Sequence, residues 1–266
     1  MQNNIFILNP SLQLILVVFF ALSMGSFTTL LTYRLATKQP FMMVRSKCIN
    51  CQAILKAINL IPVFSWLMQK GKCHNCHSKI SIRYPLIELS FVVIYLTIYF
   101  VLQQKISLQL LLYFAIATML LAMIIVDLEH YFIPDAMQYI LTVFVGLLVV
   151  FSVEYFSIFI AYRDGFLFVF FGIALWLFFY FSAGIPAIGV DDLKFFFIAG
   201  ILLGAKNFIA FMMLSGIIGV VFGLAWQKLK NDETFPFAPA MCISALICLL
   251  FGEHLKISDY LGKLIF

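Results

Sequence analysis

The sequence predicts an all-α polytopic membrane protein with about eight transmembrane helices and one small polar module. Of its 266 residues, 64% are hydrophobic and only 11% are charged, whereas soluble domains have about 25% charged residues. The apolar residues form runs close to the length that crosses a bilayer, about 20 residues. This composition excludes a soluble globule, a disordered chain and a disulfide-stapled secreted domain.

The apolar runs divide the chain in order. We expect helices at 12–35, 86–103, 108–127, 136–155, 166–183, a short stretch ending near 204, 208–226 and 237–251. Charged residues and a glycine at 162–165 predict a turn between the fourth and fifth helices. The resulting domains are a first transmembrane helix at 1–35, a cytoplasmic four-cysteine loop at 36–85, a seven-helix membrane core at 86–252 and an interfacial tail at 253–266.

The distribution of basic residues predicts the orientation. Between Arg34 and Arg83 there are nine Lys or Arg residues and no Asp or Glu, so this loop is expected in the cytoplasm. The charge is concentrated in this one loop of a membrane protein and does not indicate nucleic-acid binding. No basic residue precedes the first apolar run, which is the reverse of a secretory signal. We therefore expect a retained first helix, with both the N- and C-termini outside.

The basic loop contains two C-x-x-C pairs, Cys48 with Cys51 and Cys73 with Cys76. Two such knuckles at this separation predict a four-cysteine, zinc-ribbon-like site, and a closed set of four thiolates predicts structural zinc. Reduced or disulfide-forming thiols are the alternative reading, as is replacement of one cysteine by His74 or His77. The apolar residues of the loop are expected either to pack on the metal site or to dip into the bilayer surface. Cys242 and Cys248 lie in an apolar run and are expected to be packing residues.

Carboxylates are rare in this chain, so their positions are informative. Asp127 ends the third predicted helix and Asp192 begins the sixth, and the topology places both at the inner face. Two carboxylates at the same depth can act as general base and general acid, as in an aspartic protease. Simpler readings exist for several aspartates: Asp135 is expected to cap the helix that follows it, and Asp191 or Asp192 could cap the sixth helix in the same way. Glu129 and His130 are expected to be interfacial polar residues, and Glu88, which lies near Arg83, is expected to form an ion pair or a headgroup contact.

Several segments together resemble a known family. They are residues 25–34 (GSFTTLLTYR), 45–51 (RSKCINC), 59–66 (NLIPVFSW), 71–76 (GKCHNC), 82–88 (IRYPLIE), 127–135 (DLEHYFIPD) and 189–194 (GVDDLK). In this order they resemble the type IV prepilin leader peptidases, membrane aspartic peptidases of the G-x-G-D group. The resemblance covers about residues 20 to 240. Residues 235–239 (FPFAP) look like the family's Pro-Phe-Gly-Pro segment, with Ala238 in place of glycine.

The resemblance implies the functional residues. The family's catalytic aspartates fall on Asp127 and Asp192, supported by Gly189 and Lys194, and its paired cysteines fall on the four described above. Asp191 stands where the family has glycine, so the motif reads G-x-D-D. Asp191 is therefore the alternative to Asp192 as the second catalytic residue.

The resemblance also implies the reaction. The substrate is a prepilin or pseudopilin of a type IV pilus or type II secretion system, whose basic leader is removed at the cytoplasmic face of the bacterial inner membrane. The new N-terminus is then methylated from S-adenosylmethionine, and we expect the donor to bind in the cytosolic loop. Membrane lipid is the other expected partner. The rival classes are a proton-coupled transporter and a non-catalytic zinc-ribbon scaffold of a pilus or secretion assembly.

Overall fold

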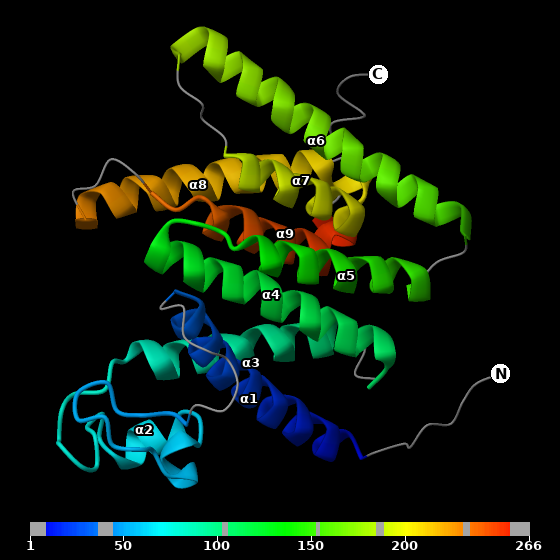
Figure 1. The fold of residues 1–266 in the computed structure, drawn as a ribbon. Helices are drawn as coiled ribbons and strands as arrows, with labels where there is room; N and C mark the ends of the chain where they lie inside the picture. The colour runs from blue at the N-terminus through cyan, green and yellow to red at the C-terminus, as the bar shows by residue number, and fades with distance from the viewer. Residues whose placement is uncertain are drawn as a thin grey trace. The chain divides into compact units, whose positions relative to one another are not determined.

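The computed structural model of the chain describes residues 9–36, 45–102, 106–152, 155–184, 189–230 and 235–255 (Figure 1). Within these ranges the chain forms nine α-helices and two short 3-10 helices. The strand-like pairings in the same ranges are two isolated bridges, Lys47 with Ile54 and Lys72 with Lys79. The chain divides into two compact units, Met1–Leu110 and Leu111–Phe266. The predicted all-helical fold is confirmed.

The first unit is a pair of long helices with a small module inserted between them. The pair consists of α1 (Pro10–Ala36) and α3 (Arg83–Val101), which pack along each other. The inserted module, residues 45–82, contains the 3-10 helix η1 (Ala57–Leu60) and the short helix α2 (Phe64–Met68). It occupies the position in the sequence that was predicted for the four-cysteine loop.

The second unit is a bundle of longer helices. They are α4 (Leu108–His130), α5 (Asp135–Ser152), α6 (Tyr155–Ala183), α7 (Val190–Leu203), α8 (Phe208–Lys230) and α9 (Ala238–Leu255), with η2 (Ala205–Asn207) between α7 and α8. Together with α1 and α3 they account for all eight helices that hydropathy predicted. The tail beyond residue 255, expected at the interface, lies outside the described residues.

Helix length and composition agree with a multi-pass membrane protein. Five described helices are long and apolar enough to cross a bilayer, namely α1, α3, α4, α6 and α8. The apolar stretches Asp135–Phe151 of α5 and Ala238–Gly252 of α9 are shorter. Helix α7 has only 14 residues, a length of about 21 Å at 1.5 Å per residue, whereas the hydrocarbon core is about 30 Å thick.

The predicted turn at 162–165 is wrong, because α6 continues through it. The charges that suggested a turn are compensated inside the unit. Arg163 donates to Asp164 from Nε at 3.0 Å and from Nη2 at 2.8 Å. The other oxygen of Asp164, a residue only 4% exposed, accepts the backbone N–H of Ala205 at 2.8 Å. The local composition predicted a break in the helix, but contacts with residues distant in the sequence allow the helix to continue.

Helices α6 and α7 cross at glycines. A Cβ atom on Gly200 would lie 2.6 Å from the carbonyl oxygen of Asp164, and one on Gly165 would lie 2.9 Å from Cγ1 of Ile201. Real Cβ atoms do not approach so closely, so only glycine allows this crossing. The contact fixes α7, the helix that carries the G-x-D-D motif, against the longer α6.

Candidate active site and metal centre

Asp127 lies near the C-terminal end of α4 and is buried, with 6% of its surface exposed. Its Oδ2 accepts the backbone N–H of Ala238 at 2.9 Å. Ala238 is the first residue of α9, so its N–H has no acceptor within that helix. The carboxylate thus lies at the positive end of the α9 dipole. This donor belongs to the FPFAP segment, residues 235–239, which was noted in the sequence only for its resemblance to a family segment.

Helix α4 ends abruptly just after Asp127. The N–H of Tyr131 donates to the carbonyl oxygen of Asp127 at 2.9 Å, and Tyr131 has a left-handed φ of 58°. This is a helix-ending conformation that glycine usually adopts. The indole N–H of Trp226 in α8 donates to the Tyr131 hydroxyl at 3.2 Å. The end of α4 is therefore tied to α8.

Asp192 lies in the first turn of α7. Its Oδ2 accepts the backbone N–H of Gly189 at 3.0 Å, the bond by which an acidic residue at the third position closes a helix N-terminus. The N-cap of α7 is therefore Gly189 and not Asp191 or Asp192, although Asp192 contributes to the capping from the third helical position. A cap and a catalytic role are compatible, because this bond uses only one of the two carboxylate oxygens.

Asp127 and Asp192 converge although 64 residues separate them in the sequence. The Asp192 carboxylate lies within electrostatic range of Asp127, and both carboxylates lie within that range of the Cys242 thiol. Cys242 is fully buried in α9, as expected for a packing residue. Its position beside both aspartates was not predicted, because a lone cysteine in an apolar run carries no such signal.

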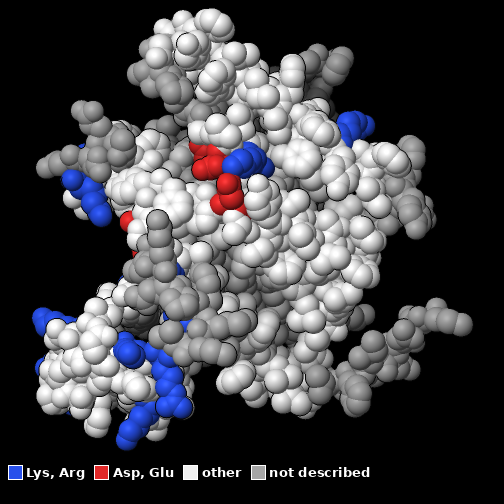
Figure 2. All heavy atoms as spheres, in the orientation of Figure 1, with Lys and Arg blue, Asp and Glu red and all other residues white. Residues whose placement is uncertain are grey.

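Asp191 has a different environment from Asp192. Its Oδ1 accepts a hydrogen bond from Lys194 Nζ at 3.0 Å, and Lys194 also donates to Asp135 Oδ1 at 2.6 Å. The amide of Gln138 donates to the Asp191 carbonyl oxygen at 3.1 Å. These contacts join the start of α5 to the start of α7. On the face drawn in Figure 2, red acidic side chains lie next to a blue basic one within otherwise uncharged surface.

The two C-x-x-C knuckles fold alike. In the first, the Cys48 N–H donates to Ala53 O and the Gln52 N–H donates to Cys48 O. In the second, the Cys73 N–H donates to Ser78 O and the His77 N–H donates to Cys73 O. Gln52 and His77 have the same left-handed φ, 57° and 56°. The repeated turn directs both thiols of each pair to one point.

The four sulfurs form a group that can hold a metal ion. Cys48, Cys51, Cys73 and Cys76 have Sγ atoms within 4.8 Å of one another, and no histidine belongs to this group in the described part of the chain. The Cys48 and Cys76 sulfurs are 3.8 Å apart. Thiolates bound tetrahedrally at about 2.3 Å from zinc would be about 3.8 Å apart, so the donor set fits zinc. All four cysteines are free of disulfide bonds.

Local hydrogen bonds favour the thiolate form of Cys48 and Cys76, whereas burial and the neighbouring Cys76 and Cys48 thiols raise the pKa of Cys51 to about 11. The backbone N–H groups of Cys51 and Asn50 lower the pKa of Cys48 to about 6. The Ser78 hydroxyl, 3.0 Å from Cys76 Sγ, is the main cause of the lowered pKa of that thiol. Ser78 was not singled out from the sequence, because its role depends on the fold of the second knuckle. Thiolates are the metal-binding form of cysteine.

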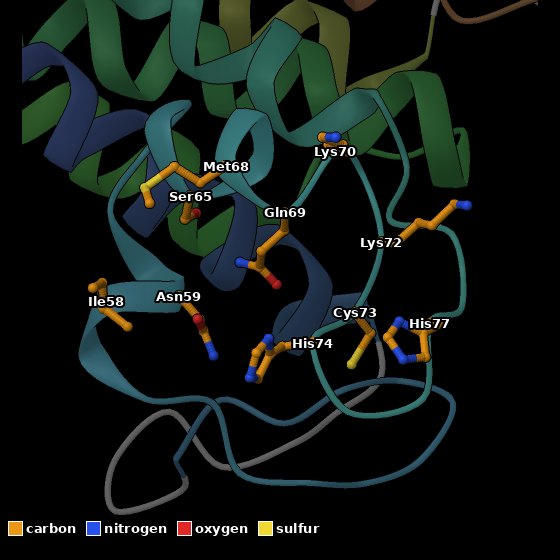
Figure 3. Close-up of a pocket in the computed structure, with 10 residues that line it drawn as sticks. All are labelled: Ile58, Asn59, Ser65, Met68, Gln69, Lys70, Lys72, Cys73, His74 and His77. Carbon is orange, nitrogen blue, oxygen red and sulfur yellow. The ribbon is translucent and has the colours of Figure 1, made fainter.

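Beside the second knuckle is a hollow of about 400 Å³ (Figure 3). It is bordered by η1 and α2 on one side and by the second knuckle on the other. Its lining consists of Ile58, Asn59, Ser65, Met68, Gln69, Lys70, Lys72, Cys73, His74 and His77. This volume lies in the range of small-molecule sites, about 300–1,000 Å³. The lining offers amides, imidazoles and ammonium groups, and no carboxylate.

Glu88 has a more specific contact than the interfacial one expected. It is 6% exposed, and its Oε2 accepts the backbone N–H of Val63 at 2.6 Å. A Cβ on Gly25 of α1 would lie 2.9 Å from the Glu88 Cα. Glu88 therefore marks the place where α1, α3 and the residue preceding α2 meet.

Comparison with protein-family models covers most of the chain. The model described as "Bacterial Peptidase A24 N-terminal domain" matches residues 19–102, and the one described as "Type IV leader peptidase family" matches residues 114–224. The first match includes the four cysteines and the second includes Asp127 and Asp192. No solved structure matches this sequence.

Curated relatives match over most of their length. A protein of Legionella pneumophila is 29% identical over 98% of this chain and 99% of its own, and one of Bacillus subtilis (strain 168) is 28% identical over 91% and 95%. A protein of Stutzerimonas stutzeri is 30% identical over 80% of this chain and 74% of its own. All three bear the name "Prepilin leader peptidase/N-methyltransferase".

Proposed function

The chain belongs to the type IV leader peptidase family, and from this premise we propose that it is a membrane aspartic endopeptidase that removes prepilin leaders and methylates the new N-terminus. The observation that carries the proposal is the convergence of Asp127 and Asp192, from different helices, at one place in the second unit. The substrates are prepilins or pseudopilins.

The catalytic pair is Asp127 and Asp192. One carboxylate takes a proton from water as the water oxygen attacks the scissile carbonyl carbon, while the other, in its acid form, donates a proton to the carbonyl oxygen. Collapse of the tetrahedral intermediate breaks the C–N bond, and the leaving amine takes up a proton. Repulsion between two close carboxylates favours the state in which they share one proton.

Lys194 and Gly189 are positioning residues for Asp192. The Gly189 N–H bonds the Asp192 carboxylate, and Lys194 ties α7 to Asp135 at the start of α5. Asp191 is engaged by the same ammonium group. These contacts favour Asp192 over Asp191 as the catalytic residue, and they give Asp191 a use of its own in place of the family's glycine.

The protein resides in the bacterial inner membrane, with the active site at the cytoplasmic face and both termini outside. The support is the charge pattern, since the segment between α1 and α3 is rich in Lys and Arg and lacks Asp and Glu. In this orientation the ends of the helices that bear Asp127 and Asp192 lie on the side of the substrate's leader.

Two cofactors complete the proposal. The cysteines Cys48, Cys51, Cys73 and Cys76 hold structural zinc, which crosslinks the two knuckles of a module too small to build a large core. S-adenosylmethionine, which supplies the methyl group, binds in the hollow beside the second knuckle, where Lys70 or Lys72 can pair with its carboxylate and the amides of Asn59 and Gln69 can donate to its polar atoms. The volume of the hollow and its hydrogen-bond donors fit a ligand of this kind.

A single assay tests the proposed function. The purified protein is reconstituted with a prepilin and S-adenosylmethionine, and the pilin is analysed by mass spectrometry. We expect leader loss followed by methylation of the new N-terminus. A transporter or a scaffold would leave the prepilin intact. Complete cleavage with an unmethylated N-terminus, at excess donor, would reduce the assignment to a peptidase.

The two activities should separate by mutation. The Asp127→Asn protein should fail to cleave but should still methylate a pre-cleaved pilin, because the donor hollow contains no catalytic aspartate. Conversely, Asn59→Ala or Gln69→Ala should impair methylation more than cleavage. Retention of metal by these loop variants is the control that the module remains folded. Equal loss of both activities in metal-loaded protein would contradict a donor site in the hollow.

A further inference from the structure

The module between α1 and α3 carries a group of exposed apolar side chains. They are Leu60, Ile61, Phe64 and Leu67, each between 43% and 59% exposed, and they are called the apolar patch below. Phe64 and Leu67 lie at positions i and i+3 of α2, so they share one face of that helix. A group of large apolar side chains exposed together marks an interaction surface.

The module's own packing does not use this patch. The residue of α2 that turns inward is Trp66, whose indole N–H donates to Ile80 O at 3.2 Å. Its ring lies against Gly71, where a Cβ would come within 2.9 Å of Trp66 Cζ2. The module thus has an inner face of α2, built around Trp66, and an outer face without a partner among the described residues.

The position of α2 along α3 sets its depth. Val63, which directly precedes α2, donates its N–H to Glu88 of α3. Glu88 is five residues into α3, which begins at Arg83, or about 7.5 Å along the helix axis at 1.5 Å per residue. We take α3, an apolar helix of spanning length, to cross the bilayer, and the start of α2 is then at the level where that helix enters the membrane.

The positive charge around the apolar patch indicates which kind of surface the patch would bind. Residues 45–82 include Arg45, Lys47, Lys56, Lys70, Lys72 and Lys79 and no Asp or Glu. Figure 2 shows blue side chains over the region where the module lies, with no red among them. An apolar helix face flanked by basic residues is typical of an element that lies in an anionic membrane interface.

We propose that the apolar patch inserts into the headgroup and upper acyl region of the bilayer that α1 and α3 cross, with the module's basic residues on anionic phospholipids. The module is then a membrane-surface element and not a domain free in the cytoplasm. Three features support this docking: the hydrogen bond between Val63 and Glu88, the exposed face of α2 and the surrounding positive charge. Docking of the module on the membrane does not depend on peptidase or methyltransferase activity.

Photo-crosslinking of the full-length protein tests this inference. The protein is reconstituted in nanodiscs that contain phosphatidylglycerol, with the photoreactive residue p-benzoylphenylalanine at Leu67. The matched control carries the probe at Asn75, an exposed polar residue on the second knuckle. We expect the Leu67 probe to form lipid adducts at least fivefold more often than the Asn75 probe, as measured by mass spectrometry. Zwitterionic lipid should lower the yield at Leu67 several-fold.

The other possible occupants give different products. Crosslinks from Leu67 to a second copy of this chain, or to added pilin, in place of lipid would overturn the inference, as would equal lipid yields at Leu67 and Asn75. A second arm uses Phe64→Ser with Leu67→Ser. This variant should keep its metal but show faster amide hydrogen exchange over residues 57–68 in anionic nanodiscs. Unchanged exchange in the metal-loaded variant would also count against membrane insertion.

Discussion

Asp127 is held by a backbone donor, the N–H of Ala238. This arrangement allows an unusual test. Proline at the first position of a helix is well tolerated and has no N–H, so Ala238→Pro removes the donor while retaining the α9 start. A hydrogen bond to a charged group contributes about 1.5–3 kcal/mol, so we expect the rate of leader cleavage to fall by about 10- to 100-fold.

The matched control for this change is Ala238→Gly, which keeps the N–H. It should cleave at close to the original rate. Rates are compared by single-turnover cleavage of a prepilin in micelles. Equal rates for the proline and glycine variants would mean that the Ala238 N–H does not orient Asp127 for catalysis.

The assignment of the catalytic pair gives a second prediction that concerns single residues. Asp127→Asn and Asp192→Asn should each abolish cleavage, because asparagine cannot take or give the required proton. Asp191→Asn should retain cleavage, because Lys194 keeps its bond to Asp135. Cleavage assays on variants shown to be folded and inserted decide the point. Activity in Asp192→Asn together with its loss in Asp191→Asn would reverse the assignment.

At the scale of elements, the crossing of α6 and α7 is the most constrained contact. In Gly200→Ala the new Cβ would meet the Asp164 carbonyl oxygen at 2.6 Å, so the helices must separate. Overpacking of this kind costs about 1–3 kcal/mol. The control is Gly216→Ala in α8, where a Cβ meets nothing within 4 Å. We expect a lower unfolding midpoint in detergent for the first variant and no loss for the second.

The helices also show which parts of the fold can be predicted from the sequence. Helices α1 and α3 to α9 follow from apolar runs, because in a bilayer helix formation satisfies every backbone polar group. The helix start at 155 was missed because Arg163, Asp164 and Gly165 carry the composition of a turn. Their actual partners, Ala205 and residues of α7, lie some 40 residues away along the chain. No local pattern records such a pairing.

The same limit applies to the candidate site. Cysteine spacing predicted the four-sulfur group, since each knuckle is local. The pairing of Asp127 with Ala238, of Lys194 with Asp135, and of Cys76 with Ser78 depends on how distant or neighbouring segments fold together. The resemblance to a family supplied Asp127 and Asp192 as candidates, but it gave no account of what holds them.

For the molecule as a whole, the metal is expected to decide whether the module is ordered. The protein purified without chelator should carry about one zinc per chain. Cys48→Ser with Cys51→Ser should release it, because half of the ligands are lost. Amide exchange over residues 45–82 should then rise, while that of α4 to α9 should change little. Metal analysis showing four free thiols and no zinc in the unaltered protein would contradict the metal centre.

Helix α7, with its 14 residues, makes the protein sensitive to the lipid around it. A helix about 9 Å shorter than the hydrocarbon core produces hydrophobic mismatch, which a bilayer relieves by thinning locally. Thinning beside the G-x-D-D end of α7 would bring water and headgroups toward the aspartates. Acyl-chain length thereby becomes a variable of the reaction. We therefore expect prepilin cleavage to be faster in short-chain than in long-chain bilayers of the same headgroup.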